Sequence, residues 1–147
     1  MFAKRIRVLP RLFTQVRNLR RLLGAERAVM PHVPVLESAL RHLDGVPVFH
    51  WHSDAFDLPE HGLPLAATPD CPTQAFALGP NLLGLQFHPE VTARGLENWY
   101  VGHYRALGAE DAPKVADLRE QAERHAAALR ESGTRFLREW LAALRFE

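Results

Sequence analysis

Two histidine-containing segments carry the residue types that proteins use for acid–base or metal chemistry. In residues 86–90, Gln-Phe-His-Pro-Glu, His88 and Glu90 stand on either side of a proline. A carboxylate two residues from an imidazole, across a rigid turn, can hydrogen-bond to one ring nitrogen and stabilise the cationic form of the histidine. This pair has the composition of a general base, although a His-x-Glu pattern alone is more often a surface or structural histidine.

The second segment places His50, His52 and Asp54 at alternate positions. Alternate residues of a strand point to one face, so two imidazoles and a carboxylate can meet there and bind a metal ion. A metal-dependent hydrolase is therefore an alternative interpretation. Its further ligands are not evident in the sequence, and we expect neither a bound metal nor a cofactor.

The elements that must position these residues follow from the hydrophobic pattern. Short apolar runs separated by Pro, Gly, Asp and Asn predict strands over 46–51, 63–68, 73–78 and 82–87. His88 and Glu90 follow the last of them, at the rim where α/β folds present side chains to ligands.

Helices are predicted before and after these strands in the sequence, as packing partners of the sheet. One covers 35–43, a second begins after the capping residue Thr92 and ends near 107, and a third begins at 111–113 and continues to 144 with Gly133 as a possible interruption. Trp99, Tyr100 and Tyr104 recur at helical spacing and are interpreted as packing residues. The remaining histidines are expected to be solvated: His32, His42, His61, His103 and His125.

Composition and charge exclude several classes of protein. With 47% hydrophobic and 24% charged residues and no long apolar run, the chain predicts one soluble domain without a membrane span. Residues 1–36 hold eight Lys and Arg against Glu26, a formal charge of +7, whereas the remainder holds ten basic and sixteen acidic residues, or −6. Apolar residues every three or four positions predict an amphipathic basic helix over 1–24. Nucleic acid binding would depend on these arginines alone and is not expected.

The amino-acid sequences of three segments point to a family more specifically than the His-x-Glu pattern does. GLQFHPEVT at 84–92 resembles the strand-and-loop signature of class I glutamine amidotransferases. VFHWHSDAFDLP at 48–59 and AATPDCPTQAF at 66–76 resemble, in the same order, segments of the free-standing, GMP-synthase-like members. The resemblance covers residues 35–147 and implies part of a flavodoxin-like α/β fold with long C-terminal helices.

The resemblance implies glutamine amide hydrolysis and ammonia transfer. In this chemistry a cysteine thiolate attacks the side-chain amide of glutamine, forms a thioester and releases ammonia for an acceptor. His88 then corresponds to the base, Glu90 to the carboxylate that orients it, and the backbone around Trp51 and His52 to the surface that binds the α-amino and carboxylate groups of glutamine.

The nucleophile of this family is missing from the sequence. It stands in a Gly-x-Cys-x-Gly turn, and no such run occurs here. The single cysteine, Cys71, lies between Asp70 and Pro72 and corresponds to a noncatalytic loop cysteine, so we expect a structural role. One cysteine also forms no intramolecular disulfide, which favours a cytoplasmic location.

We therefore expect residues 35–147 to be the C-terminal portion of a truncated amidotransferase domain, and residues 1–34 to be a basic extension unrelated to it. Besides glutamine, the expected partners are a chain that supplies the missing turn or an ammonia-accepting synthetase. The alternative without catalysis is an inactive remnant or a partner-binding module, because a parallel sheet without its first strands would expose apolar edges.

Overall fold

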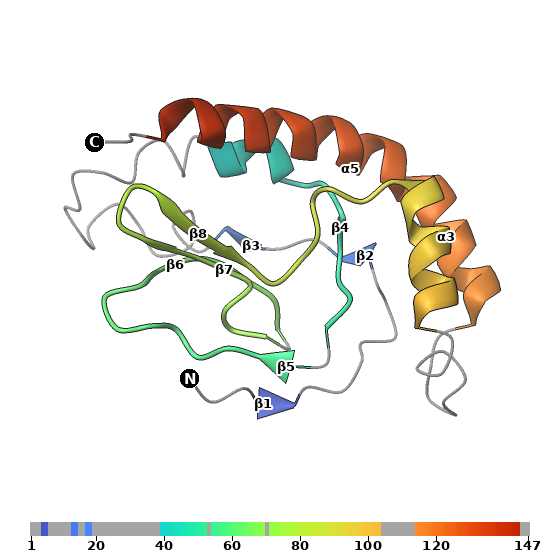
Figure 1. Cartoon of the computed structure of the whole chain (residues 1–147), viewed down its shortest axis with the longest axis horizontal. Helices are drawn as coiled ribbons and strands as arrows, with labels where there is room; N and C mark the ends of the chain where they lie inside the picture. The colour runs from blue at the N-terminus through green and yellow to red at the C-terminus, as the bar shows by residue number, and fades with distance from the viewer. Residues whose placement is uncertain are drawn as a thin grey trace.

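The computed structural model describes residues 4–5, 13–14, 17–18, 39–52, 54–69, 71–103 and 114–144 (Figure 1). Within them the helices are the 3-10 helix η1 (Arg41–Leu43), α3 (Ala93–Gly102) and α5 (Val115–Ala143). The strands are β1 (Lys4–Arg5), β2 (Phe13–Thr14), β3 (Arg17–Asn18), β4 (Val48–Phe49), β5 (Asp54–Ala55), β6 (Leu63–Ala67), β7 (Ala75–Leu78) and β8 (Leu82–Leu85).

The main sheet has the strand order β3-β6-β7-β8. The strands predicted over 63–68, 73–78 and 82–87 are confirmed as β6, β7 and β8, and that over 46–51 is reduced to β4. Every pairing between the described strands is antiparallel, so the expectation of a parallel sheet is wrong for them. For the β6–β7 and β7–β8 pairs the reason is loop length, because parallel neighbours need a crossover of about a dozen residues and the loops 68–74 and 79–81 are shorter.

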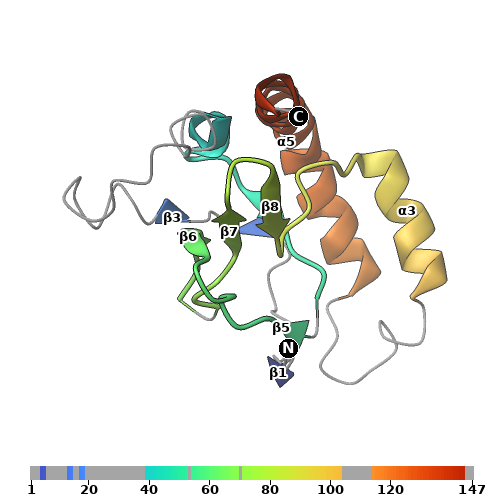
Figure 2. The same cartoon turned by 60° about the vertical axis from the view of Figure 1, so that its left-hand side comes forward.

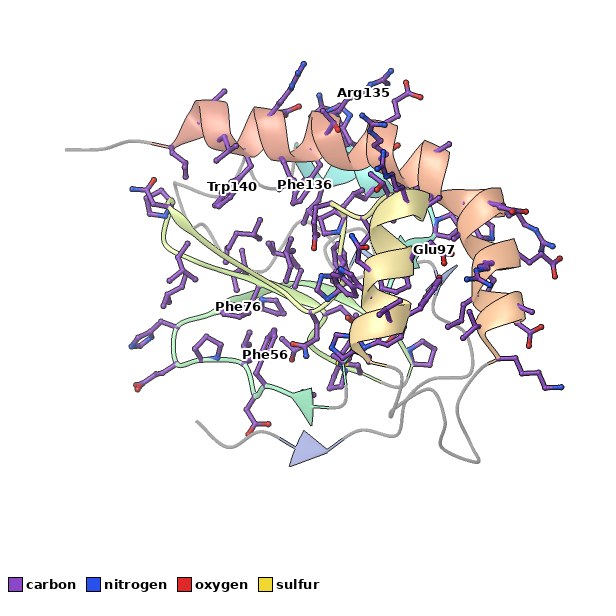
Figure 3. All side chains as sticks on the ribbon, turned by 45° about the vertical axis from the view of Figure 1, so that its right-hand side comes forward. Phe56, Phe76, Glu97, Arg135, Phe136 and Trp140 are labelled. Atoms are coloured by element: carbon purple, nitrogen blue, oxygen red, sulfur yellow. The ribbon has the colours of Figure 1, made fainter. Side chains whose placement is uncertain are left out.

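In the β7–β8 hairpin, a glycine makes room for an aromatic ring on the opposite strand. Phe76 stands opposite Gly84, and an ideal Cβ at position 84 would overlap the Phe76 ring. The Phe76 ring also meets Phe56 edge to face, with 5.1 Å between centroids (Figure 3). Gly79 adopts a φ of 65° in the hairpin turn, a conformation that favours glycine. The Phe76–Gly84 pair and the turn at Gly79 therefore fix the register of β8, the strand that leads to His88.

The helix predicted over 1–24 is wrong at the positions that the structure describes. There β1 pairs with β5, β2 with β4 and β3 with β6, all antiparallel. Backbone N–H and C=O groups along a strand edge require partners, and these pairs supply them to strands distant in the sequence. The remaining residues before Ala39 lie outside the described part. They include 35–38, the first half of the helix predicted over 35–43, and the second half is confirmed as helical at 39–43.

Helix α5 covers the sheet and packs against α3. Figures 1 and 2 show the first part of α5 beside α3 and the later part across the sheet. In Figure 3, Phe136 and Trp140 point from α5 toward the sheet and Arg135 points away. The fully buried side chains include Phe49, Leu65, Leu96, Leu118, Leu129 and Phe136. The two predicted C-terminal helices are thus confirmed as packing elements.

Ion pairs join the helices to their neighbours. Arg119 of α5 donates two hydrogen bonds to Glu97 of α3, at 2.9 and 2.7 Å. Near the other end of α5, Glu139 accepts a hydrogen bond from Arg41 at 2.7 Å and contacts His42 Nε2 at 2.8 Å. The expectation of a solvated His42 is therefore wrong, because its partner comes from 97 residues away in the sequence.

The predicted start of the second helix after Thr92 is confirmed, but its predicted end near 107 is wrong, because α3 ends at Gly102 with His103 as its C-cap. The Thr92 hydroxyl accepts a hydrogen bond from the Gly95 N–H at 3.0 Å and caps α3. The proposed start of the next helix at 111–113 lies outside the described residues, and α5 continues through Gly133 without interruption. Among the described residues, neither α3 nor α5 offers a stretch long and apolar enough to cross a bilayer.

Candidate active site

The segment that carries His88 is fixed by backbone hydrogen bonds. After β8 ends, the Gln86 N–H donates to the Gln74 carbonyl at 2.9 Å, and the His88 N–H donates to the Phe49 carbonyl at 2.8 Å. The second bond forms an isolated antiparallel bridge between Phe49 and His88. The main chain of His88 is therefore attached to β4, a fully buried strand.

The side chains of His88 and Glu90 are in direct contact. His88 Nδ1 lies 2.8 Å from Glu90 Oε1. Burial favours the protonated carboxyl of Glu90, but the hydrogen bond and charge interaction with His88, with a backbone hydrogen bond, outweigh this and lower its pKa below the ordinary 4.5. The ionised carboxylate can only accept, so Nδ1 donates, and in the uncharged form of the ring Nε2 keeps its lone pair. The imidazole is 30% exposed, which leaves it accessible to a substrate.

An aromatic cluster surrounds the His88 ring. The Trp99 indole meets it edge to face, with 4.7 Å between centroids and 88° between planes. Phe49 lies 6.2 Å from His88 and 5.6 Å from Trp99. Aromatic rings in such arrangements prefer a fixed mutual orientation. Trp99 and Phe49 therefore restrict the plane of the imidazole, as Glu90 restricts its tautomer.

The structure places Trp51 beside this pair and His52 apart from it. Trp51 stacks on Phe49 at 5.9 Å and meets Trp99 edge to face at 6.2 Å, so Trp51 and His88 contact the same two rings. His52 instead has its ring centroid 6.0 Å from that of His50, with no ring contact to His88 among the described side chains. The binding roles predicted for Trp51 and His52 stay predictions.

His50, His52 and Asp54 do not form one continuous strand. His50 and His52 follow β4, whereas Asp54 begins β5 and its side chain lies outside the described part. His50 is 2% exposed and meets Phe87 edge to face at 6.3 Å. Among the side chains that are described, no group of three or more His, Cys, Asp or Glu gathers to hold a metal ion.

Cys71 is buried in the loop between β6 and β7. Its N–H donates to the Thr68 hydroxyl at 3.1 Å, and its thiol donates to the Thr73 carbonyl at 3.5 Å. Burial raises the pKa of the thiol above 9.0, against the smaller lowering effect of the Thr73 hydrogen bond. A nucleophilic cysteine needs a lowered pKa and access to substrate. Within the described residues, no hydrogen bond joins Cys71 to His88.

Sequence reasoning missed two contacts of the aromatic cluster. Trp99 packs against the core as expected, and the structure also places it on the candidate base. His103, expected to be solvated, donates from Nδ1 to the Trp99 carbonyl at 3.0 Å and lies 5.4 Å from the Trp51 ring. The four-residue spacing of Trp99 and His103 is the signal that predicts the contact between these two residues.

Four chains among the solved structures are similar to this one, including the following two. A crystal structure of a glutamine amidotransferase from Thermotoga maritima matches 65% of this chain, with 31% identity and a TM-score of 0.59. A crystal structure of a glutamine amido transferase from Methylobacillus flagellatus matches 79% of it, with 21% identity and a TM-score of 0.65.

The matched region spans 41% and 50% of those two chains, so this chain covers half of their length or less. No family model matches the sequence, and no curated protein does. The predicted partial α/β fold with long C-terminal helices is confirmed by the two structural matches.

Proposed function

Because the chain carries part of a class I glutamine amidotransferase-like fold, we propose that it supplies the base and the orienting carboxylate for hydrolysis of the glutamine side-chain amide. The observation that carries the proposal is the 2.8 Å contact between His88 Nδ1 and Glu90 Oε1, which leaves Nε2 as a base on a partly exposed ring. We propose that the ammonia goes to an acceptor on another chain, such as a synthetase.

The proposed steps balance as glutamine plus water giving glutamate plus ammonia. His88 Nε2 takes the proton of a cysteine thiol, and the thiolate attacks the amide carbon of glutamine. The imidazolium returns this proton to the departing nitrogen, which leaves as ammonia. Water then attacks the thioester with His88 again as base, and the cysteine is released. Glu90 stabilises the imidazolium in both halves of the cycle.

The proposal requires a nucleophilic cysteine from outside these 147 residues, and we propose that a second polypeptide supplies it. Cys71 is 1% exposed with a raised pKa, and a Gly-x-Cys-x-Gly turn does not occur in the 147 residues. In the proposed assembly the backbone at Trp51 and His52 receives the α-amino and carboxylate groups of glutamine. Residues 35–147 form the amidotransferase-like portion, residues 1–34 are a basic extension, and a cytoplasmic location suits the single reduced thiol.

A complementation assay tests this function. The chain is mixed with a polypeptide that contains the Gly-x-Cys-x-Gly turn typical of class I glutamine amidotransferases, and ammonia release from glutamine is measured. We expect release from the mixture and none from either part alone. His88→Ala in the mixture should reduce the rate by about 1,000-fold or more.

His42→Ala is the matched control, because His42 also contacts a glutamate but belongs to the η1–α5 contact. It should leave the rate of the mixture unchanged. Absence of ammonia release from the mixture would contradict the proposed function. Release by the isolated chain that is abolished by Cys71→Ser would contradict the structural assignment of Cys71.

A further inference from the structure

Gly133 stands in the interior of α5, where glycine is a poor helix former. It is buried, and the structure shows what it faces. An ideal Cβ at position 133 would overlap the Pro89 carbonyl oxygen and come within 3.1 Å of the carbonyl carbon. By contrast, a Cβ on Gly102, the last residue of α3, would meet nothing within 4 Å. The close approach of Gly133 is therefore a specific contact.

The contact involves the main chain between the two site residues. Pro89 joins His88 to Glu90, is itself buried, and has a backbone restricted by its ring. A flexible side chain can move away from an added methyl group, but a backbone carbonyl moves only with its neighbours. Displacement of Pro89 would therefore change the separation or orientation of His88 and Glu90.

The turn is also attached to β4. The His88 N–H donates to the Phe49 carbonyl of β4 at 2.8 Å, and Trp99 contacts the imidazole. The turn thus lies between β4 and α5 with little room for adjustment. The amide nitrogen of His88 is fixed by β4, and the carbonyl of Pro89 is held against α5.

We propose that Gly133 is a positioning residue: its missing side chain lets α5 seat the Pro89 carbonyl and thereby sets the geometry of the His88–Glu90 pair. The catalytic consequence rests on the proposed function. The geometric part can be tested on the chain alone, so that failure of one is distinguishable from failure of the other.

The test uses NMR of the full chain with ¹⁵N-labelled histidine. Gly133→Ala should shift the His88 ring signals, because the Nδ1 hydrogen bond weakens and the Trp99 ring current on the imidazole changes. Gly102→Ala is the matched control and should leave the His88 signals unchanged. Unchanged His88 signals in a folded Gly133→Ala chain would overturn the proposal.

A measurement on the unmodified chain covers the case in which Gly133→Ala does not fold. Nuclear Overhauser contacts between the Gly133 α protons and the Pro89 ring protons are expected, since the ideal Cβ position at 133 lies 3.3 Å from Pro89 Cβ. Their absence would overturn the proposal, whether or not the variant folds.

The complementation assay supplies the catalytic arm. Gly133→Ala should lower kcat for ammonia release by about 100-fold, as expected for a misplacement near 1 Å, with a much smaller change in KM. Shifted His88 signals without any turnover by the unmodified mixture would retain the positioning role and reject the proposed function. Full kcat together with shifted signals would reject the catalytic consequence.

Discussion

The Trp99 indole lies nearly perpendicular to the His88 imidazole, at 88° and 4.7 Å between centroids. Because Trp99 also packs against Phe49 and Trp51, its removal affects both the core and the candidate base. Trp99→Ala should lower the free energy of unfolding by about 3 kcal/mol in urea denaturation. Val101→Ala, at a residue that is 79% exposed, should change it by less than about 0.5 kcal/mol. Equal stability of the two variants would contradict the packing role.

Glu90 makes stability depend on pH in a predictable direction. Its pKa is lowered in the folded chain, so its contribution is fully present above the ordinary value of 4.5 and is lost as pH falls through the lower folded value. Glu90→Gln should therefore destabilise the chain near neutral pH, and the difference from the unmodified chain should vanish in acid. The carboxylate is 53% exposed, which limits the difference to about 1 kcal/mol.

Urea denaturation from about pH 7 to about pH 3 measures this difference. Glu60→Gln is the control, because the Glu60 side chain is 90% exposed and should contribute almost nothing. A Glu90→Gln difference that grows as the pH falls would have the wrong sign and would contradict the prediction.

Cys71 should behave as a protected, protonated thiol. It is 1% exposed and burial raises its pKa above 9.0, so a disulfide reagent near neutral pH should label the native chain at least about 100-fold more slowly than the urea-unfolded chain. Cys71→Ala should leave ammonia release in the complementation assay unchanged. Rapid labelling of the native thiol would show that it is accessible and would argue against a structural role.

The Thr92 cap should contribute measurably to stability, whereas a second helical threonine should not. Thr92→Ala removes the hydroxyl that accepts from the Gly95 N–H and should lower the free energy of unfolding by about 1 kcal/mol. Thr134, exposed on α5, donates to the Arg130 carbonyl at 2.7 Å. Thr134→Ala should be neutral or slightly stabilising, because alanine is the better helix former. Thermal or urea unfolding of both variants decides whether the cap has this effect.

Local signals predicted the elements that depend on neighbours in sequence. The cap at Thr92, the hairpin strands and the long C-terminal helix follow from residues within a few positions of one another. The motif around His88 also identified the pair whose 2.8 Å contact the structure shows. These successes share one physical basis, which is that the deciding interactions are short in sequence.

The failures involve partners that are distant in sequence. The basic N-terminal segment has helical spacing, yet Phe13 lies opposite Phe49 in a strand pair. Gly133 suggested an interruption of the helix. The group that leaves no room for a side chain at this position is the Pro89 carbonyl, which is distant in sequence. His42 looked solvated because Glu139 lies at the far end of the chain. A pattern within one segment holds no information on which distant group it will meet.

Helix α5 touches three separate segments along its 29 residues: α3 through Arg119, the Pro89 turn through Gly133, and η1 through Glu139. Each added residue rotates a helix by about 100°, so a single insertion between Arg119 and Gly133 would turn these contacts out of phase. The solvent-facing side of this helix can vary in composition, but its length between the contacts cannot. Insertions and deletions there should be far more harmful than substitutions.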